Sequence, residues 1–149
     1  MYNGIINVYK EKGYTSFDVV ARMRGICGQK KIGHTGTLDP DATGVLPVCL
    51  GKATKLCDLL TDKNKTYEAV LLLGKTTDTQ DITGEVLEEK STEALTEEKV
   101  REAIEGFIGD YEQIPPMYSA LKVNGKKLYE LAREGKVIER KARPVKILD

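Results

Sequence analysis

The chain has 149 residues and equal numbers of basic and acidic side chains, 23 of each, so its bulk charge does not indicate a nucleic-acid partner. The three cysteines form no CxxC pair, and the chain has a single histidine, so a zinc site has little support. Without a bilayer-spanning apolar run or a signal peptide, we expect a cytoplasmic protein with no membrane partner and no metal.

The first half of the chain predicts a strand, a capped helix, a glycine-rich loop and a short helix. Pro47 argues against a central strand over the whole of the apolar segment that follows the loop. The predicted elements are a strand at Ile5–Tyr9, a helix from a cap at Thr15 or Ser16 to about Cys27, the loop Gly33–Gly44, and a helix at Lys52–Leu60.

The second half predicts more strands and two helices, which makes the chain α+β. Val100, Ile104 and Phe107 recur at helical spacing and predict a buried stripe on one helix. The predicted elements are a strand at Thr66–Leu73, a loop over 74–84, a strand at 85–89, a helix at Thr96–Ile108, a hairpin turn at Asn124-Gly125, a helix at Leu128–Arg133 and a strand within 136–149.

Charge is unevenly distributed along the second half. Residues 85–105 carry eight acids and three bases, whereas 122–146 carry nine bases and three acids, a local net charge of +6. A basic segment of this kind fits either phosphate contact or an ordinary solvated face.

The loop "GHTGTLDPDATG" concentrates turn-forming and hydroxyl residues around two carboxylates. It lacks the Gly-Lys-Ser/Thr of a phosphate loop. It also fails as a calcium loop, because the twelfth position counted from Asp39 is Leu50 rather than Glu. The "DPDAT" segment fits an aspartyl phosphohydrolase of the haloacid dehalogenase type, but no apolar strand precedes it.

The remaining interpretation is a rigid loop that presents Asp39 to a cleft. Pro40 fixes its own φ and restricts Asp39 to extended conformations. Nearby glycines permit close backbone approach, and threonine hydroxyls satisfy local backbone groups.

The segment "GHTGTLDPDATGVLPVCLGKATK" resembles the motif of the TruB family of tRNA pseudouridine synthases, which act on uridine 55 in the T-loop. The resemblance continues through "YKEKGYTSFD", "DKNKTYEAVLLLGKTTDTQDITG", "IPPMYSALKVNGKKLYELAREG" and "ARPVKI", and so covers nearly the whole chain. It implies a pseudouridine synthase fold, with a mixed, mostly antiparallel sheet flanked by helices.

The resemblance also implies roles for individual residues. Asp39 takes the catalytic position, as nucleophile or base, and no cofactor is required. Tyr67 takes the position of the tyrosine that stacks on the target base. The other residues with implied roles bind substrate (His34, Lys10, Lys122, Lys126 and Lys127), shape the loop (Gly33, Gly36, Thr37, Pro40 and Gly44) or support the site (Gly13, Asp78 and Thr79).

Two departures and one absence qualify the resemblance. Tyr9 and Glu11 stand where the family has Asp and Pro, and the later arginine motif of the family is missing. We therefore expect residues 1–149 to be the N-terminal portion of a catalytic domain, with an RNA-closing thumb at about 111–136, lacking the C-terminal strands and the PUA domain. We expect a monomer that binds tRNA and is weakly active or inactive alone. A non-catalytic module that binds or remodels tRNA is the alternative from another class.

Overall fold

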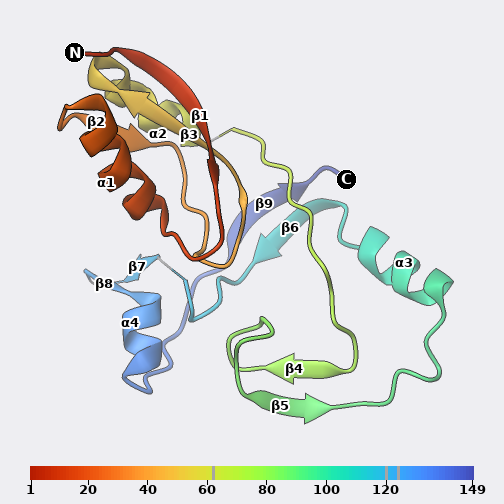
Figure 1. Cartoon of the computed structure of the whole chain (residues 1–149). Helices are drawn as coiled ribbons and strands as arrows, with labels where there is room; N and C mark the ends of the chain where they lie inside the picture. The colour runs from red at the N-terminus through yellow and green to blue at the C-terminus, as the bar shows by residue number, and fades with distance from the viewer. Residues whose placement is uncertain (62, 120, 124) are drawn as a thin grey trace. The chain divides into compact units, whose positions relative to one another are not determined.

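The computed structural model describes residues 1–61, 63–119, 121–123 and 125–149 and confirms the α+β class (Figure 1). The chain divides into two compact units, Met1–Glu68 and Ala69–Asp149, which are described separately below. None of the helices in the described ranges has the length and apolar character that a membrane span requires.

The first unit is built on a three-stranded antiparallel sheet. Strand β3 (Gly44–Leu50) lies between β1 (Gly4–Lys10) and β2 (Ile32–His34). The strand predicted at Ile5–Tyr9 is thus confirmed as β1. Residue Lys10 pairs with Gly44, so the ends of the glycine-rich loop are fixed by the sheet.

Pro47 lies inside the central strand β3, so the expectation that Pro47 would prevent a central strand over this whole segment is wrong. Pro47 is tolerated there because β2 is short and its last residue pair is His34 with Val48. The Pro47 carbonyl accepts a hydrogen bond from the Thr35 amide at 3.1 Å, on the side of β3 where β2 has just ended. Because the N–H and C=O of one residue face the same neighbour in an antiparallel sheet, the missing N–H breaks no ladder bond.

Helix α1 (Ser16–Cys27) begins and ends as its sequence predicts. Thr15 is the N-cap, and it forms a reciprocal capping box with Asp18. Hydrogen bonds from Thr15 lower the pKa of Asp18. Gly28 closes the helix with a φ of 60°, in the left-handed region where glycine is favoured.

The core of the first unit lies between α1 and one face of the sheet (Figure 1). Because side chains alternate along a strand, Leu46, Val48 and Leu50 of β3 share that face. The buried cluster comprises Val19, Val20, Ile32, Leu46, Val48 and Leu50. After β3, the helix predicted at Lys52–Leu60 is realised as a 3₁₀ turn, η1 (Gly51–Leu56), followed by α2 (Cys57–Thr61).

The described residues of the second unit form three small antiparallel pairs and two helices. Two of its strands, β4 and β6, fall in segments that the sequence did not assign to strands. The pairs are β4 (Lys75–Thr77) with β5 (Val86–Glu89), β6 (Gly109–Gln113) with β9 (Arg143–Ile147), and β7 (Lys122–Val123) with β8 (Lys126–Lys127); the helices are α3 (Glu97–Glu105) and α4 (Leu128–Arg133). The predicted hairpin and α4 are confirmed, although Asn124 of the turn is outside the described residues.

The strand predicted at Thr66–Leu73 is wrong, because these residues belong to no strand. Val70 is 98% exposed, and Leu71 and Leu72 are also exposed. The pattern has the composition of a buried strand, but a strand needs a hydrogen-bonded neighbour, and the described residues provide none here.

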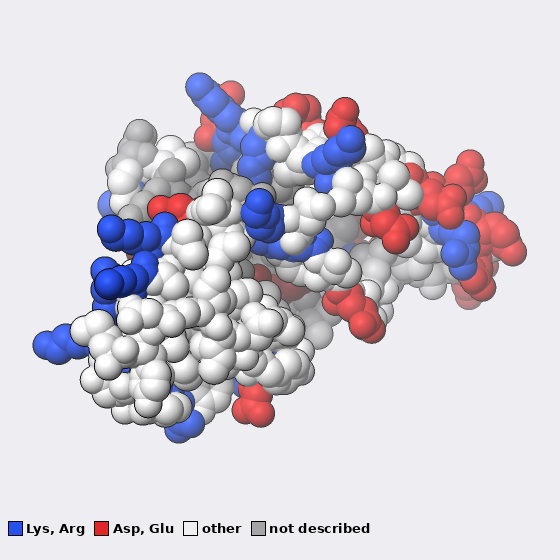
Figure 2. All heavy atoms as spheres, turned by 90° about the horizontal axis from the view of Figure 1, so that it is seen from above, with Lys and Arg blue, Asp and Glu red and all other residues white. Residues whose placement is uncertain are grey.

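Helix α3 is confirmed with its Thr96 cap but ends at Glu105 rather than Ile108. Its predicted stripe is not buried, since Ile104, Phe107 and Ile108 are exposed and no element of its own unit packs extensively against it. Acidic side chains outnumber basic ones over α3, at the right of Figure 2, as the charge pattern of 85–105 predicts.

Truncating Leu46 tests the assignment of the core. Leu46 is 2% exposed, so Leu46→Ala should lower the free energy of unfolding of the first unit by about 2–5 kcal/mol. Val45→Ala is the matched control on the same strand; its side chain faces away and is 63% exposed, so its effect should stay within about 0.5 kcal/mol. Hydrogen exchange of the β3 amides in urea measures both, and equal effects would contradict the assignment.

Candidate functional site

The loop between β2 and β3 is held on its first side by Ser16. The Ser16 hydroxyl donates to the Leu38 carbonyl at 3.3 Å and accepts from the Leu38 amide at 3.0 Å. One side chain therefore satisfies both backbone groups of the residue before Asp39. Ser16 itself is almost fully buried, which fixes its position.

The other side of the loop is held by Lys10, which is 0% exposed. Its ammonium donates to the carbonyls of Tyr14 at 2.7 Å, Glu11 at 3.1 Å and Pro40 at 3.3 Å. The Pro40 carbonyl also accepts from the Gly13 amide at 2.8 Å. A buried charge is tolerated only when its donors are satisfied, and here backbone carbonyls do so.

Asp39 thus lies between two anchored residues, and its own side chain is exposed. Its carbonyl closes a turn by accepting from the Ala42 amide at 3.1 Å. Within the described residues, the Asp39 carboxylate takes part in no hydrogen bond or ion pair, whereas Asp41 pairs with Lys12 at 3.5 Å. The loop therefore presents one free carboxylate on a fixed backbone.

Of the residues predicted to shape the loop, Gly33 and Gly44 occupy positions where the structure favours glycine, whereas Gly36 and Thr37 do not. Gly33 packs closely against Cys57, whose sulfur would lie 3.1 Å from an added Cβ. Gly44 has a φ of +153°, which residues with a side chain rarely adopt. A Cβ at Gly36 would meet nothing within 4 Å, and Thr37 is exposed, so packing does not explain either residue.

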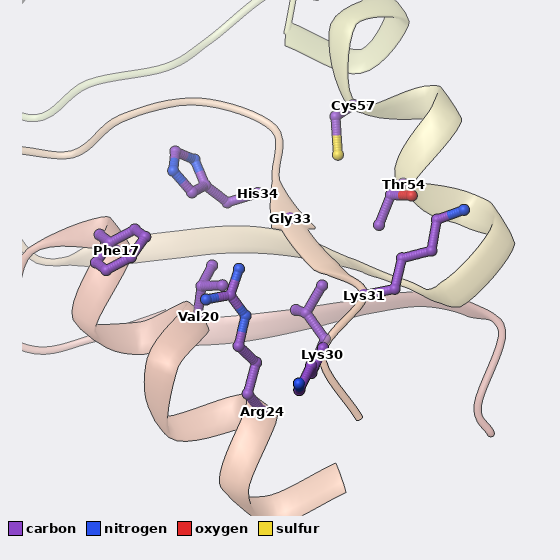
Figure 3. A pocket seen from close by; sticks show the side chains of 10 residues that line it. Phe17, Val20, Arg24, Lys30, Lys31, Gly33, His34, Thr54 and Cys57 are labelled. Atoms are coloured by element: carbon purple, nitrogen blue, oxygen red, sulfur yellow. The ribbon is translucent and has the colours of Figure 1, made fainter. Parts of the chain in front are cut away.

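His34 ends β2 and faces a pocket beside the loop (Figure 3). The pocket is an open depression with a volume of about 430 Å³, and Asp39 and Tyr67 are not among its described lining residues. Nearby, burial raises the pKa of the Cys49 thiol to about 11, with a further contribution from the neighbouring Cys57. Cys49 therefore remains a thiol, and Cys57 forms part of the pocket wall.

The other predicted substrate-binding residues are more dispersed. Tyr67 is 70% exposed in the segment after α2. Lys126 and Lys127 belong to the second unit, where Lys126 pairs with Glu134 at 3.5 Å and Lys127 donates to the Tyr129 hydroxyl at 3.2 Å. The Lys122 side chain is outside the described residues.

Asp78 and Thr79 lie in the loop between β4 and β5 of the second unit. The Asp78 carboxylate accepts from the Glu85 amide at 2.9 Å, and Thr79 donates to Asp81 at 2.8 Å. Hydrogen bonds from Thr83, together with the one from Thr79, lower the pKa of Asp81. These contacts give the loop a defined shape of its own.

Sequence reasoning did not assign Ser16 to the loop, nor Arg24, Lys30 and Lys31 to the pocket. The signal for Ser16 was present, because Thr15 and Ser16 are adjacent hydroxyls and a helix needs only one as its cap. The basic pocket residues were overlooked because the stronger charge run lies at 122–146.

Comparisons with known proteins place the loop in a family context. The model of the TruB family pseudouridylate synthase (N terminal domain) matches residues 24–149. The tRNA pseudouridine synthase B of Lachnoclostridium phytofermentans is 73% identical over 145 residues, which cover 97% of this chain and 47% of that protein. The tRNA pseudouridine synthase B of Clostridium perfringens is 54% identical over 145 residues, which cover 97% of this chain and 49% of that protein. The chain thus spans about half the length of the curated relatives it matches.

A solved structure is also similar. A chain in the crystal structure of a Cbf5–Nop10–Gar1 complex aligns with a TM-score of 0.57 and 28% identity, covering 96% of this chain and 33% of that one.

Replacing Lys10 tests the anchoring of Pro40. Lys10→Met keeps the buried apolar stem but leaves three carbonyls without their shared donor. We expect the Gly13 amide, which donates to Pro40, to exchange with deuterium about tenfold faster, because an unsatisfied buried group costs about 1–3 kcal/mol. Lys12→Met removes only the exposed pair with Asp41 and should leave this rate unchanged. Equal rates in the two variants would show that Lys10 does not hold the loop.

Proposed function

We propose that this chain, which belongs to the TruB family of pseudouridylate synthases, takes part in converting uridine 55 in the T-loop of tRNA into pseudouridine. The observation that supports it is the loop Gly33–Gly44, in which Ser16 and Lys10 fix the backbone on both sides of Asp39 and leave its carboxylate free. Such a loop supplies one carboxylate in a defined position.

The reaction is an isomerisation, so the product has the same atomic composition as uridine, although the hydrogen on C5 is exchanged for one on N1. The bond from C1′ to N1 breaks, the uracil turns, and C5 bonds to C1′ while it loses its proton and N1 gains one. We assign Asp39 to the first stage, as a nucleophile or as the base that removes a ribose proton. Preorganisation is useful here because a carboxylate already in place needs no rearrangement during the reaction.

The target uridine is stacked in folded RNA and must leave the stack to reach Asp39. Extrusion of a base costs a few kcal/mol, which a protein offsets with new stacking. We assign the stacking to Tyr67, whose exposed ring is free to take a base. His34 holds the flipped nucleotide, and Lys122, Lys126 and Lys127 contact RNA phosphates from the segment at about 111–136.

The proposal includes the setting of the reaction. The chain acts on tRNA as a monomer in the cytoplasm. It uses no metal or organic cofactor, because a carboxylate and positioned protons suffice for cleavage and re-formation of the glycosidic bond.

Substitution of Asp39 tests the chemistry, with Asp41 as the matched control in the same loop. Asp39→Asn should lower pseudouridine formation by more than about a hundredfold while tRNA binding persists, since the catalytic carboxylate is lost. Asp41→Asn removes an exposed pair with Lys12 and should retain activity. Tritium release from tRNA labelled at uracil C5 measures turnover, because C5 loses its hydrogen in the reaction.

The same variants should be compared in a chimera in which the rest of the Lachnoclostridium phytofermentans relative follows Asp149. Turnover in the chimera but not in the 149-residue chain would show that chemistry needs residues beyond those present here. An Asp39→Asn chimera that still releases tritium would refute the catalytic assignment. Binding of tRNA by every variant without tritium release from any of them would favour a module that binds or remodels tRNA.

A further inference from the structure

The pocket beside the candidate loop has a strongly one-sided charge. It lies within the first unit, between α1, β2 and η1 (Figure 3). Among the described residues, three cationic residues line it and none of the lining residues is acidic; the described lining residues are Phe17, Val20, Arg24, Lys30, Lys31, Ile32, Gly33, His34, Thr54 and Cys57. Its volume of about 430 Å³ is within the range of ligand pockets in proteins.

The cations that line this pocket have no ion-pair partner among the described residues. Across the described ranges, no salt bridge involves Arg24, Lys30 or Lys31, and the one ion pair of the first unit joins Lys12 to Asp41 outside the pocket. The described lining of the pocket therefore carries a net positive charge, and its electrostatic potential favours an anion as the occupant.

Two buried side-chain nitrogen atoms at the pocket also lack partners among the described residues. Arg24 Nε and His34 Nδ1 are covered by neighbouring atoms but make no hydrogen bond to any described residue. An unsatisfied buried polar atom is costly, and native structures rarely keep one without a reason. A hydrogen-bond acceptor on a ligand bound in the pocket would satisfy Arg24 Nε.

Arg24 is already oriented for such an acceptor. Its guanidinium lies over the Phe17 ring at 5.8 Å and reaches from α1 toward the strand that carries His34 (Figure 3). Stacking on the ring limits the rotamers of Arg24 while leaving its Nη groups available. A guanidinium held in this way suits the two oxygens of a phosphate, to which arginine binds in a bidentate manner.

We propose that this pocket binds a backbone phosphate of the RNA next to the nucleotide presented to Asp39, with Arg24 as its main ligand and Lys30, Lys31 and His34 in support. The inference rests on the proposed function for the identity of its ligand. His34 and Asp39 are five residues apart, so their Cα atoms are separated by at most about 18 Å. Since successive nucleotides rise by about 3.4 Å in a helix, one short RNA segment reaches both.

The salt dependence of RNA binding tests the pocket. Fluorescence anisotropy would follow the chain binding an RNA hairpin with the T-stem and loop sequence, from about 50 to about 200 mM salt. Arg24→Gln should weaken binding about fivefold to tenfold at the lower salt concentrations and reduce the slope of log K against log salt by about 0.7–0.9, the value for one phosphate contact. Arg24→Lys, which keeps the charge, should keep the slope.

Arg22 provides a matched control on the same helix. It also lies over an aromatic ring, that of Tyr14 at 5.7 Å, but does not line the pocket. Arg22→Gln removes the same charge and a similar contact, so it should leave the slope unchanged. Equal slopes for the two glutamine variants, or no RNA binding by the parent chain, would overturn the proposal. Lys30→Gln combined with Lys31→Gln should repeat the Arg24 effect in an unaltered α1.

NMR of the imidazole distinguishes an RNA phosphate from a free anion. His34 is the only histidine in the chain, so its ring signals need no assignment. The hairpin should shift these signals in the parent chain and not in Arg24→Gln. If inorganic phosphate at the same concentration shifts them and the hairpin does not, the pocket is a small-anion site and the RNA proposal fails.

The tritium assay separates this inference from the proposed function. Absence of turnover in the chimera, with the Arg24 effect intact, would overturn the chemistry and leave the phosphate site standing. Turnover together with equal salt slopes for the Arg24 and Arg22 variants would support the chemistry and overturn the phosphate site.

Discussion

Lys10 places an ammonium group where no water reaches it, and the carbonyls of Glu11, Tyr14 and Pro40 replace its hydration shell. This arrangement joins the end of β1 to the loop that carries Asp39. A lysine suits the role because its three donors radiate from one nitrogen, whereas a neutral residue of similar length offers fewer. The charge is satisfied without a carboxylate partner, so Asp39 is not drawn into an ion pair with it. Lys10 thus fixes the backbone beside Asp39 through carbonyl groups alone.

Sheet register determines whether Lys10 can reach the loop at all. It pairs with Gly44, the first residue of β3, and the loop it must hold ends at that same residue. A slip of one residue in the pairing of β1 with β3 would turn the Lys10 side chain to the opposite face. Val8 opposes such a slip, because it packs against the core from the same face of β1 as Lys10 and would turn away with it. Packing between α1 and the sheet thus fixes the position of a carboxylate outside the core.

The features that sequence predicted well are those set by neighbouring residues. The Thr15 cap, the Gly28 end of α1 and the hairpin between β7 and β8 all follow from local backbone chemistry. The rigid loop was anticipated from Leu38-Asp39-Pro40, but its anchors were not, because Ser16 and Lys10 contact it across 22 and 30 residues. No pattern in the loop itself specifies a hydroxyl or an ammonium so far away. Pro47 was misjudged for the same reason, since its tolerance depends on where β2 ends.

The neutral total charge conceals a division that bears on the proposed RNA partner. Residues 1–68 carry ten basic and seven acidic side chains, which gives a net charge of +3. Residues 69–149 carry thirteen basic and sixteen acidic side chains, which gives a net charge of −3. The basic run at 122–146 lies in the more acidic unit, where Lys126 and Lys136 are paired with Glu134. Arg24, Lys30 and Lys31 instead lie in the more basic unit and line a pocket with no acid among its described residues. Asp39 belongs to the same unit, so this shorter cluster is the stronger candidate for contact with the RNA backbone near Asp39.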